Sequence, residues 1–223
     1  MTDYPYDAVL FDLDGVLTST TALHAAAWKR TFDELLDEPF DPEHDYIAYV
    51  DGKRRDDGVR DFMRSRGFAL GPEAVRGIGD RKQALFERSL AGGVDAYPGS
   101  VRWVEHLRAA GVRTAVVSSS ANADAVLRAA GIGDLFELTV GGRDVARLGL
   151  RGKPAPDAFL TAAERLAVLP RNAIVVEDAL AGVAAGRRGH FGLVVGVARG
   201  AARHELRAAG ADVVVDDLEE LIP

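Results

Sequence analysis

The 223-residue chain carries 27 lysines and arginines against 34 aspartates and glutamates, which leaves a formal net charge of −7. Apolar residues make up 48% of the chain, which excludes an intrinsically disordered protein, and the acidic total argues against a nucleic-acid partner. The chain has no cysteine, so a disulfide scaffold, a thiolate metal site and a cysteine nucleophile are excluded.

The N-terminal residues 1–7 hold no basic segment followed by an apolar stretch, so we expect no signal peptide. No apolar run approaches the ~18 residues of a membrane-spanning helix. Together with the lack of cysteine, these features favour a cytoplasmic protein with no membrane partner. We assume a monomer, because no residue pattern bears on the oligomeric state.

Five short apolar runs, rich in β-branched residues, end in polar turns and have the length of β-strands. Strands that are buried on both faces of a parallel sheet have this pattern. Helical patterns separate most of these runs, which predicts a doubly wound α/β sheet. The expected strands are 8–11, 114–117, 173–176, 192–197 and 211–215. The expected helices of this part are 100–110, 122–130 and 155–166, and the acidic residues 216–220 predict a solvated helix start.

The segment between Leu17 and about Tyr97 breaks this alternation, because it carries helical patterns and no convincing strand. A crossover within a sheet does not ordinarily hold roughly 80 residues of helix. The sequence therefore predicts a helical domain, 18–95, inserted after the first strand of a core formed by 1–17 and 96–223. Within the insertion we expect helices at 21–36, 56–65 and 72–90, and a connection rich in proline and aspartate at 37–51.

Two carboxylates, Asp12 and Asp14, follow the first expected strand, and Gly15 allows a sharp turn there. Ligands of open parallel sheets bind beyond the carboxyl ends of the strands, so a functional site is expected at this point. A solvated loop and a calcium loop are the alternatives. An EF-hand loop fails, because Gly15 falls at loop position 4 and Leu23 takes the place of the acid at position 12.

Three further clusters follow strand ends or open helices. Ser118, Ser119, Ser120 and Asn122 could form a phosphate site or an ordinary helix cap. Lys153 stands just before a helix, where it could neutralise a phosphate or lie on the surface. Glu177 and Asp178 end an apolar strand and offer the oxygen ligands that Mg²⁺ prefers.

In one chain and in this order, the four motifs resemble the signature of the haloacid-dehalogenase-like phosphotransferases. The resemblance covers nearly the whole length, and it implies a Rossmann-like core with a helical cap after the first motif. It implies Asp12 as a nucleophile that forms an aspartyl-phosphate, and Asp14 as the general acid and base. Lys153 and Ser118 would take phosphoryl charge. The implied Mg²⁺ ligands are the Asp12 carboxylate, the Asp14 backbone carbonyl, Glu177 and Asp178.

Within the family, residues 12–20 with His24 resemble the opening of the β-phosphoglucomutases. Thr20 and His24 would then steer Asp14, and Gly52 and Arg55 fall in the cap loop, where the guanidinium would grip the phosphate that is not transferred. The alternatives are that His24 is a helix-packing or surface residue and that Arg55 belongs to a solvated basic turn. Ser120 and Asn122 match positions that touch the sugar phosphate.

The implied reaction converts β-D-glucose 1-phosphate to glucose 6-phosphate through β-glucose 1,6-bisphosphate. The alternative is a phosphatase of small phosphate esters, which shares all four motifs; a receiver or binding module would be about half as long and has no use for a cap. The chain departs from the family pattern at Ser19, Asp51, Lys53, Arg54 and Ala121, the last replacing a lysine of the second motif. These departures bear on sugar contacts and selectivity.

Overall fold

The computed structural model describes residues 5–223. Residues 1–4, which belong to the expected core segment and to the N-terminal stretch considered above for a signal peptide, lie outside the described part. A six-stranded parallel sheet forms the centre, in the order β3-β2-β1-β4-β5-β6. The expected doubly wound α/β architecture is therefore confirmed. The strands are β1 (Ala8–Phe11), β2 (Arg113–Val117), β3 (Leu138–Val140), β4 (Ala173–Glu177), β5 (Leu193–Val197) and β6 (Val213–Val215).

All four residues of β1 are buried, because their side chains alternate between the two faces of the sheet. Val9 and Phe11 join the apolar cluster beneath α4 (Pro98–Ala109) and α5 (Ala123–Ala129). Ala8 and Leu10 join the cluster on the opposite face, beneath α6, α7 and α8. These helices span Gly142–Arg147, Asp157–Arg165 and Leu180–Arg188, and α9 (Arg203–Ala209) packs beside α8.

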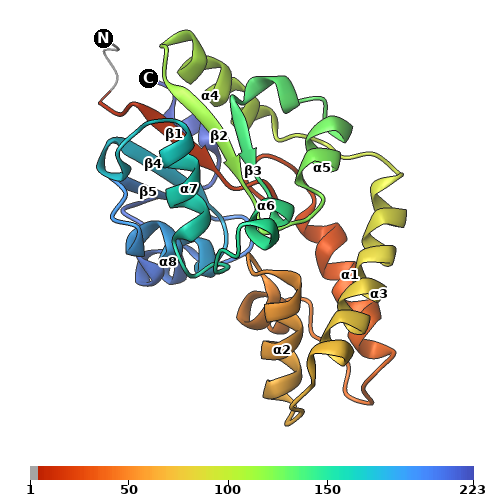
Figure 1. The fold of residues 1–223 in the computed structure, drawn as a ribbon. Coiled ribbons are helices and arrows are strands. Elements are labelled where there is room, and N and C mark those ends of the chain that lie inside the picture. The colour runs from red at the N-terminus through yellow and green to blue at the C-terminus, as the bar shows by residue number, and fades with distance from the viewer. Residues whose placement is uncertain (1–4) are drawn as a thin grey trace.

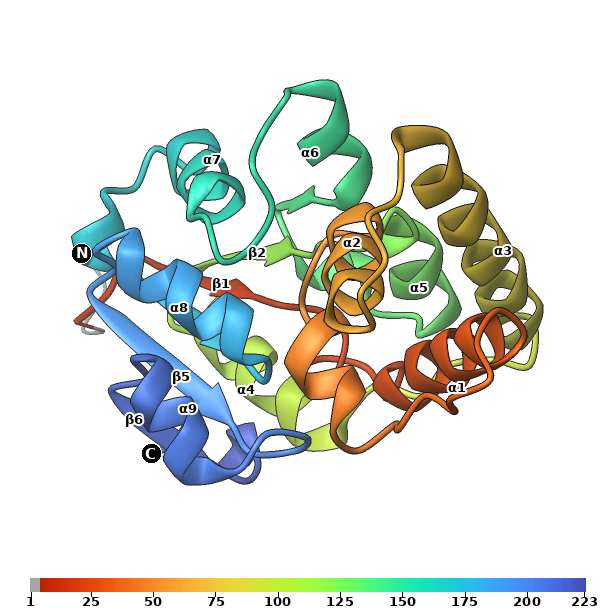
Figure 2. The same ribbon diagram turned by 90° about the horizontal axis from the view of Figure 1, so that it is seen from below.

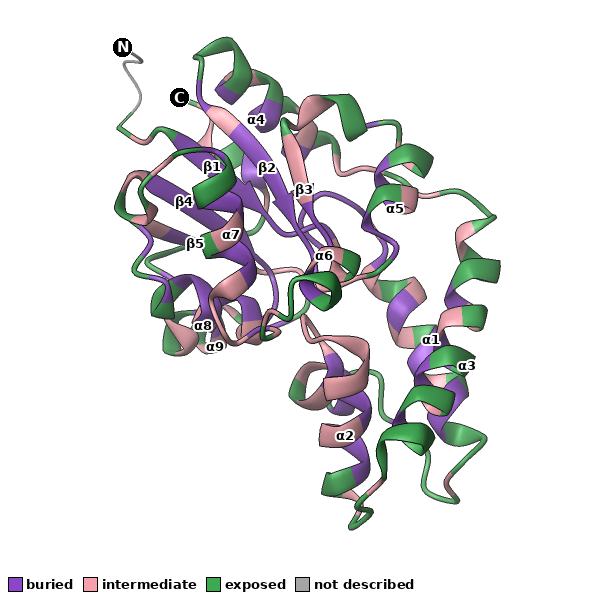
Figure 3. Cartoon of the chain, viewed as in Figure 1, coloured by how far each residue is buried: buried purple, intermediate pink, exposed green. Residues whose placement is uncertain are grey.

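The remaining helices, α1 (Thr21–Asp33), α2 (Arg55–Ser65) and α3 (Pro72–Leu90), project from the carboxyl ends of the strands (Figures 1 and 2). They enclose an apolar cluster of their own, in which Trp28, Phe32 and Phe62 pack together. Figure 3 shows the buried side of each helix turned toward this cluster. The residue limits 18–95 of a separate cap domain stay a prediction.

The observed elements differ from the expected ones in several places. α6, α8 and α9 have no counterpart among the expected helix ranges, and α1 ends at Asp33 rather than at residue 36. β3 was not expected, and the connection 37–51 ends in a π-helical turn, Tyr46–Val50, that the prediction of an irregular segment missed. The strand expected at 211–215 begins only at Val213. The acidic residues at 216–220 do begin a short 3-10 helix, Leu218–Leu221, which the Asp217 side chain caps. Within residues 5–223, no helix combines the length and the apolar character needed to cross a membrane.

Candidate active site

The predicted site residues gather where β1 and β4 end side by side at the centre of the sheet. A cavity of about 270 Å³ lies between these strand ends and the helices α1–α3. It is bordered by Asp12, Asp14, His24, Gly52, Arg55, Ser119, Ser120, Asn122 and Asp178. The other predicted residues lie behind this surface, in contact with Asp12, Asp14 or one another: Thr20, Ser118, Lys153 and Glu177.

The buried Lys153 ammonium bridges two carboxylates. Its Nζ lies 2.5 Å from Asp12 Oδ1 and 2.6 Å from Glu177 Oε1, and it also donates to the Val117 carbonyl at 3.2 Å. Burial alone lowers the pKa of Lys153, but the two carboxylates outweigh burial and hold the pKa above its ordinary value. Lys153 is therefore a permanent positive charge against the Asp12 carboxylate.

Asp12, Glu177 and Asp178 form a buried group that fits a divalent cation. Each offers a carboxylate oxygen within 4.8 Å of those of the other two. Burial, then repulsion from the other acids, raises the pKa of Asp178 well above its ordinary value, and burial raises that of Glu177 to about 8. Hard oxygen donors that repel one another in this way suit Mg²⁺.

Asp12 and Asp178 have the less committed oxygens of this group. Glu177 is occupied by Lys153, and its Oε2 accepts hydrogen bonds from the amides of Asp178 and Ala179, each at 3.1 Å. This commitment orients the Glu177 carboxylate toward Lys153, so we expect it to support the cation site mainly by fixing the other groups.

The Asp14 side chain turns away from this group toward α1. The Thr20 hydroxyl donates to Asp14 Oδ1, His24 Nε2 lies 3.3 Å from the same oxygen, and Ser118 Oγ lies 3.5 Å from Oδ2. Burial raises the pKa of Asp14, but His24, Thr20 and Lys82 outweigh burial and bring it to about 2. The carboxylate is thus ionised and surrounded by donors.

Lys82 of α3 is a part of the site that sequence reasoning missed. Its buried Nζ lies 2.5 Å from His24 Nδ1 and above the rings of Trp28 and Phe86. When Lys82 is protonated it can only donate, so Nδ1 then accepts and the ring proton of His24 lies on Nε2, the nitrogen on the Asp14 side. A lysine at one position of a long helical pattern carries no signal of this contact.

Asp51 and Tyr46 form a second group that was missed, although Asp51 stood out as a departure. Burial and the charge of Asp12 raise the pKa of Asp51 to about 7, while a hydrogen bond from Tyr46 opposes the rise. Both residues border the cavity from the segment that was expected to be irregular. With Asp56, which also borders the cavity, the site thus holds two carboxylates beyond those of the four motifs.

Two residues of the second motif contact the helical segment directly. Ser119 Oγ donates to the Gly52 carbonyl at 2.8 Å. Asn122 exchanges two amide hydrogen bonds with Gln83 of α3, at 2.6 and 3.2 Å. Ser120 Oγ, predicted to touch the substrate, accepts the amide of Asn122 at 3.1 Å. These residues therefore join the core to α1–α3 while they border the cavity.

Arg55 lies at the cavity margin, about one third exposed, with its guanidinium 3.3 Å from Asp80 and 3.7 Å from Asp56. Gly52 has a φ of +67°, and a Cβ there would meet Ala179 Cβ at 2.7 Å. The turn that brings the loop before α2 against the core therefore requires glycine.

A parallel sheet of this order, with strand-end carboxylates and a buried lysine, defines a Rossmann-like enzyme of the haloacid dehalogenase type. The family model for haloacid dehalogenase-like hydrolases matches residues 6–190, and the chain belongs to this family.

One relative found by sequence and two solved structures show which members of the family this chain resembles. A β-phosphoglucomutase of Mycobacterium tuberculosis is 47% identical over 238 residues, covering 96% of this chain and 91% of the relative. The structure of a hydrolase from Pseudomonas syringae has a TM-score of 0.85 at 28% identity, covering 96% of this chain and 95% of the other. The CbbY protein of Rhodobacter sphaeroides, in complex with xylulose-(1,5)bisphosphate, has a TM-score of 0.80 at 29% identity, covering 97% and 96%.

Proposed function

We propose that this chain is a Mg²⁺-dependent β-phosphoglucomutase that interconverts β-D-glucose 1-phosphate and glucose 6-phosphate through β-glucose 1,6-bisphosphate. The observation that carries the proposal is the contact of Asp14 with Thr20 and His24, at the start of α1, in the cavity that Asp12 also borders. The general acid and base is thus positioned by the helical segment itself. The 47% identity to a relative named as a β-phosphoglucomutase supports the same activity.

In the first transfer, a carboxylate oxygen of Asp12 forms a bond to phosphorus while the bond from phosphorus to the departing oxygen breaks. Lys153 holds Asp12 at 2.5 Å and offsets negative charge as the phosphoryl group approaches. Asp12 and Asp178 would hold Mg²⁺, with Glu177 behind them and the Asp14 carbonyl as a further implied ligand. A bound ion would neutralise charge on the phosphoryl oxygens.

Asp14 handles the proton. Its ionised carboxylate accepts the proton of the attacking sugar hydroxyl as that oxygen takes the phosphoryl group from Asp12. The same proton returns to the departing oxygen in the opposite transfer. Thr20 and His24 keep the carboxylate turned toward the cavity during both steps.

A mutase must also bind the phosphate that is not transferred, and must release its intermediate to turn around. Arg55 at the cavity margin is the proposed partner of that phosphate, because a planar guanidinium binds phosphate oxygens in pairs. Ser119 with Gly52, and Asn122 with Gln83, close the cavity against water, which would otherwise hydrolyse the aspartyl-phosphate. A relative bound to a sugar bisphosphate supports a substrate with two phosphates.

The alternative is a phosphatase of small phosphate esters, and one experiment separates the two. The protein is incubated with Mg²⁺, β-glucose 1-phosphate and a trace of the bisphosphate, while glucose 6-phosphate and free phosphate are followed together. A mutase forms glucose 6-phosphate with little free phosphate. Stoichiometric phosphate without glucose 6-phosphate would sink the mutase, and full activity of an Asp12→Asn variant would sink the nucleophile.

A further inference from the structure

One charge expected in the second motif is missing. The motif runs Ser118 to Asn122, and Ala121 stands where the family pattern has a lysine. Ala121 nevertheless borders the cavity beside Ser120 and Asn122, the positions that match contacts to the sugar phosphate. A substrate with two phosphates therefore meets an uncharged methyl group at this point of the wall.

Arg143 borders the same part of the cavity from α6. The start of α6 approaches the second motif very closely, because Gly142 N donates to the Ser120 carbonyl at 2.9 Å. A Cβ on Gly142 would lie 2.5 Å from the Ser119 carbonyl oxygen and 2.8 Å from the Ala121 amide nitrogen. Glycine permits this approach, and it places the next residue, Arg143, alongside Ala121.

The Arg143 guanidinium has no acidic partner, since no carboxylate of residues 5–223 lies within 4.0 Å of it. The adjacent acid, Asp144, is taken by Arg147 at 2.6 Å and Arg165 at 3.5 Å.

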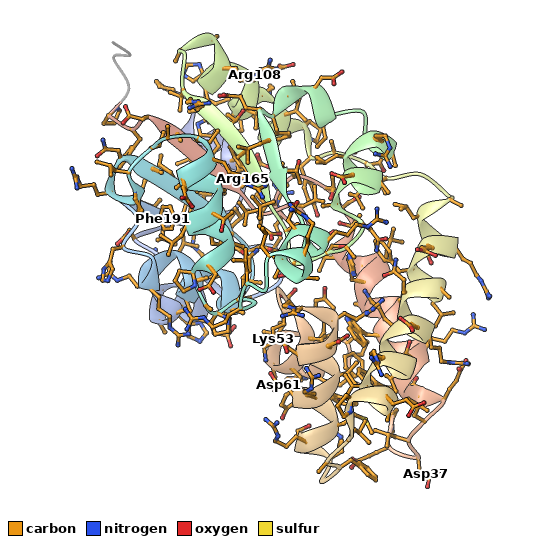
Figure 4. All side chains as sticks on the ribbon, viewed as in Figure 1. Asp37, Lys53, Asp61, Arg108, Arg165 and Phe191 are labelled. Carbon is orange, nitrogen blue, oxygen red and sulfur yellow. The ribbon has the colours of Figure 1, made fainter. Side chains whose placement is uncertain are left out.

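The other cations that border the cavity from the loop before α2 are already engaged. Lys53 Nζ lies 2.8 Å from Asp61 (Figure 4), and Arg55 pairs with Asp80. Arg54 donates to the Leu150 carbonyl at 3.4 Å. Within the part of the chain that the structure describes, Arg143 is thus a cation at the cavity whose charge no carboxylate offsets.

We propose that Arg143 supplies the positive charge that Ala121 lacks, and that it binds the phosphate that is not being transferred, together with Arg55. The inference rests on the proposed mutase function, because a phosphatase that hydrolyses an ester with one phosphate has no use for a second phosphate site. A planar guanidinium binds phosphate oxygens in pairs, and Arg143 offers one from the core whereas Arg55 offers one from the helical segment. Arg143 is therefore a specificity-determining residue for bisphosphorylated hexoses.

The test measures binding by calorimetry in the Asp12→Asn background with Mg²⁺, so that no ligand is turned over. Glucose 1,6-bisphosphate and glucose 6-phosphate are the two probes. We expect the parent to prefer the bisphosphate, and Arg143→Ala to weaken bisphosphate binding by about 10- to 100-fold. Adding Ala121→Lys to Arg143→Ala restores much of the loss, which a merely structural role of Arg143 would not allow.

Arg147→Ala is the matched control, because it removes an arginine of the same helix that pairs with Asp144 on the surface. It leaves bisphosphate binding unchanged. A parent protein without any preference for the bisphosphate overturns the proposed function and this inference with it. A preference that survives in Arg143→Ala overturns the role of Arg143 alone and leaves the mutase standing.

Discussion

Lys82 shows how a single residue can hold a catalytic group in place at the expense of stability. Burial lowers the pKa of Lys82 to about 7, although the charge of Asp14 opposes the shift. The ammonium gains only the faces of two aromatic rings and the His24 nitrogen in return for its lost hydration. We therefore infer that the role of Lys82 is to fix the tautomer of His24 and, through His24, the orientation of Asp14.

Replacing this residue, Lys82→Met, is expected to stabilise the fold and to lower activity at least tenfold, since His24 loses its donor. The unfolded chain keeps Lys82 protonated up to about pH 10.5, and the folded chain only up to about pH 7. The free energy of unfolding of the wild-type protein therefore rises between about pH 7 and pH 10.5. The extra stability of the variant is greatest below pH 7 and is smaller by about 2–3 kcal/mol at pH 9.5. Urea unfolding of both proteins below pH 7 and at pH 9.5 measures this change. An equal difference in stability between the two proteins at both pH values would contradict the assigned pKa of Lys82.

The clustering of the proposed nucleophile and the proposed metal-site acids was predictable from sequence because its signal is local. Asp12 and Asp178 each follow directly on a buried strand, so topology alone brings them to one edge. Lys82 lies 58 residues from His24 in the chain, and only the packing of α1 on α3 joins them. Asp51 was visible as a departure, but its burial beside Asp12 depends on a helical turn that the pattern did not reveal.

Among the elements, the connection between β1 and α1 carries the tightest geometry. Gly15 has a φ of +83°, and a Cβ there would lie 1.8 Å from Asp178 Oδ2. The turn therefore sets the first motif against the fourth. β3 escaped prediction because it has three residues at the edge of the sheet and two of them are only partly buried, so its pattern resembles a loop. The central strands were predictable because burial on both faces makes them continuously apolar.

Gly15→Ala tests this close approach, with Gly67→Ala as its control. Gly67 has nearly the same φ, +84°, but a Cβ there meets nothing within 4 Å. Both variants acquire about 1–2 kcal/mol of backbone strain. Gly15→Ala must in addition displace the Asp178 carboxylate, so we expect at least about 3 kcal/mol of destabilisation and loss of Mg²⁺ response. Chemical denaturation compares the two, and equal losses would show that the carboxylate yields freely.

At the scale of the whole molecule, the carboxylates of the core face a carboxylate of the helical segment across the cavity. Asp12, Asp14 and Asp178 of the core meet Asp51 of the segment across the cavity. A bound divalent cation reduces this repulsion, so it stabilises the closed arrangement as well as the reacting groups.

Mg²⁺ is therefore expected to raise the thermal unfolding temperature of the protein, by about 5–10 °C at one hundred times its dissociation constant. A chelator reverses the shift. Asp178→Asn removes one of the crowded carboxylates, so this variant is expected to respond to Mg²⁺ by less than a third as much. Asp216→Asn, which changes an exposed acid that does not border the cavity, is the control and is expected to keep the full response to Mg²⁺. An equal response in all three proteins would place the cation elsewhere.

The two crossings between the core and the helical segment lie side by side. Thr18 bridges Ala96, Ser19 N donates to the Asp95 carbonyl at 3.0 Å, and Tyr97 N donates to the Leu17 carbonyl at 2.9 Å. Backbone contacts thus hold the two ends of the insertion together in the folded protein, and the entropy of closing the loop grows only slowly with its length. We therefore expect that another helical domain, grafted between Thr18 and Ala96, would be held by the same backbone contacts. Under the proposed function, such a graft changes selectivity and must also supply counterparts of Thr20 and His24, because these residues of the segment position Asp14.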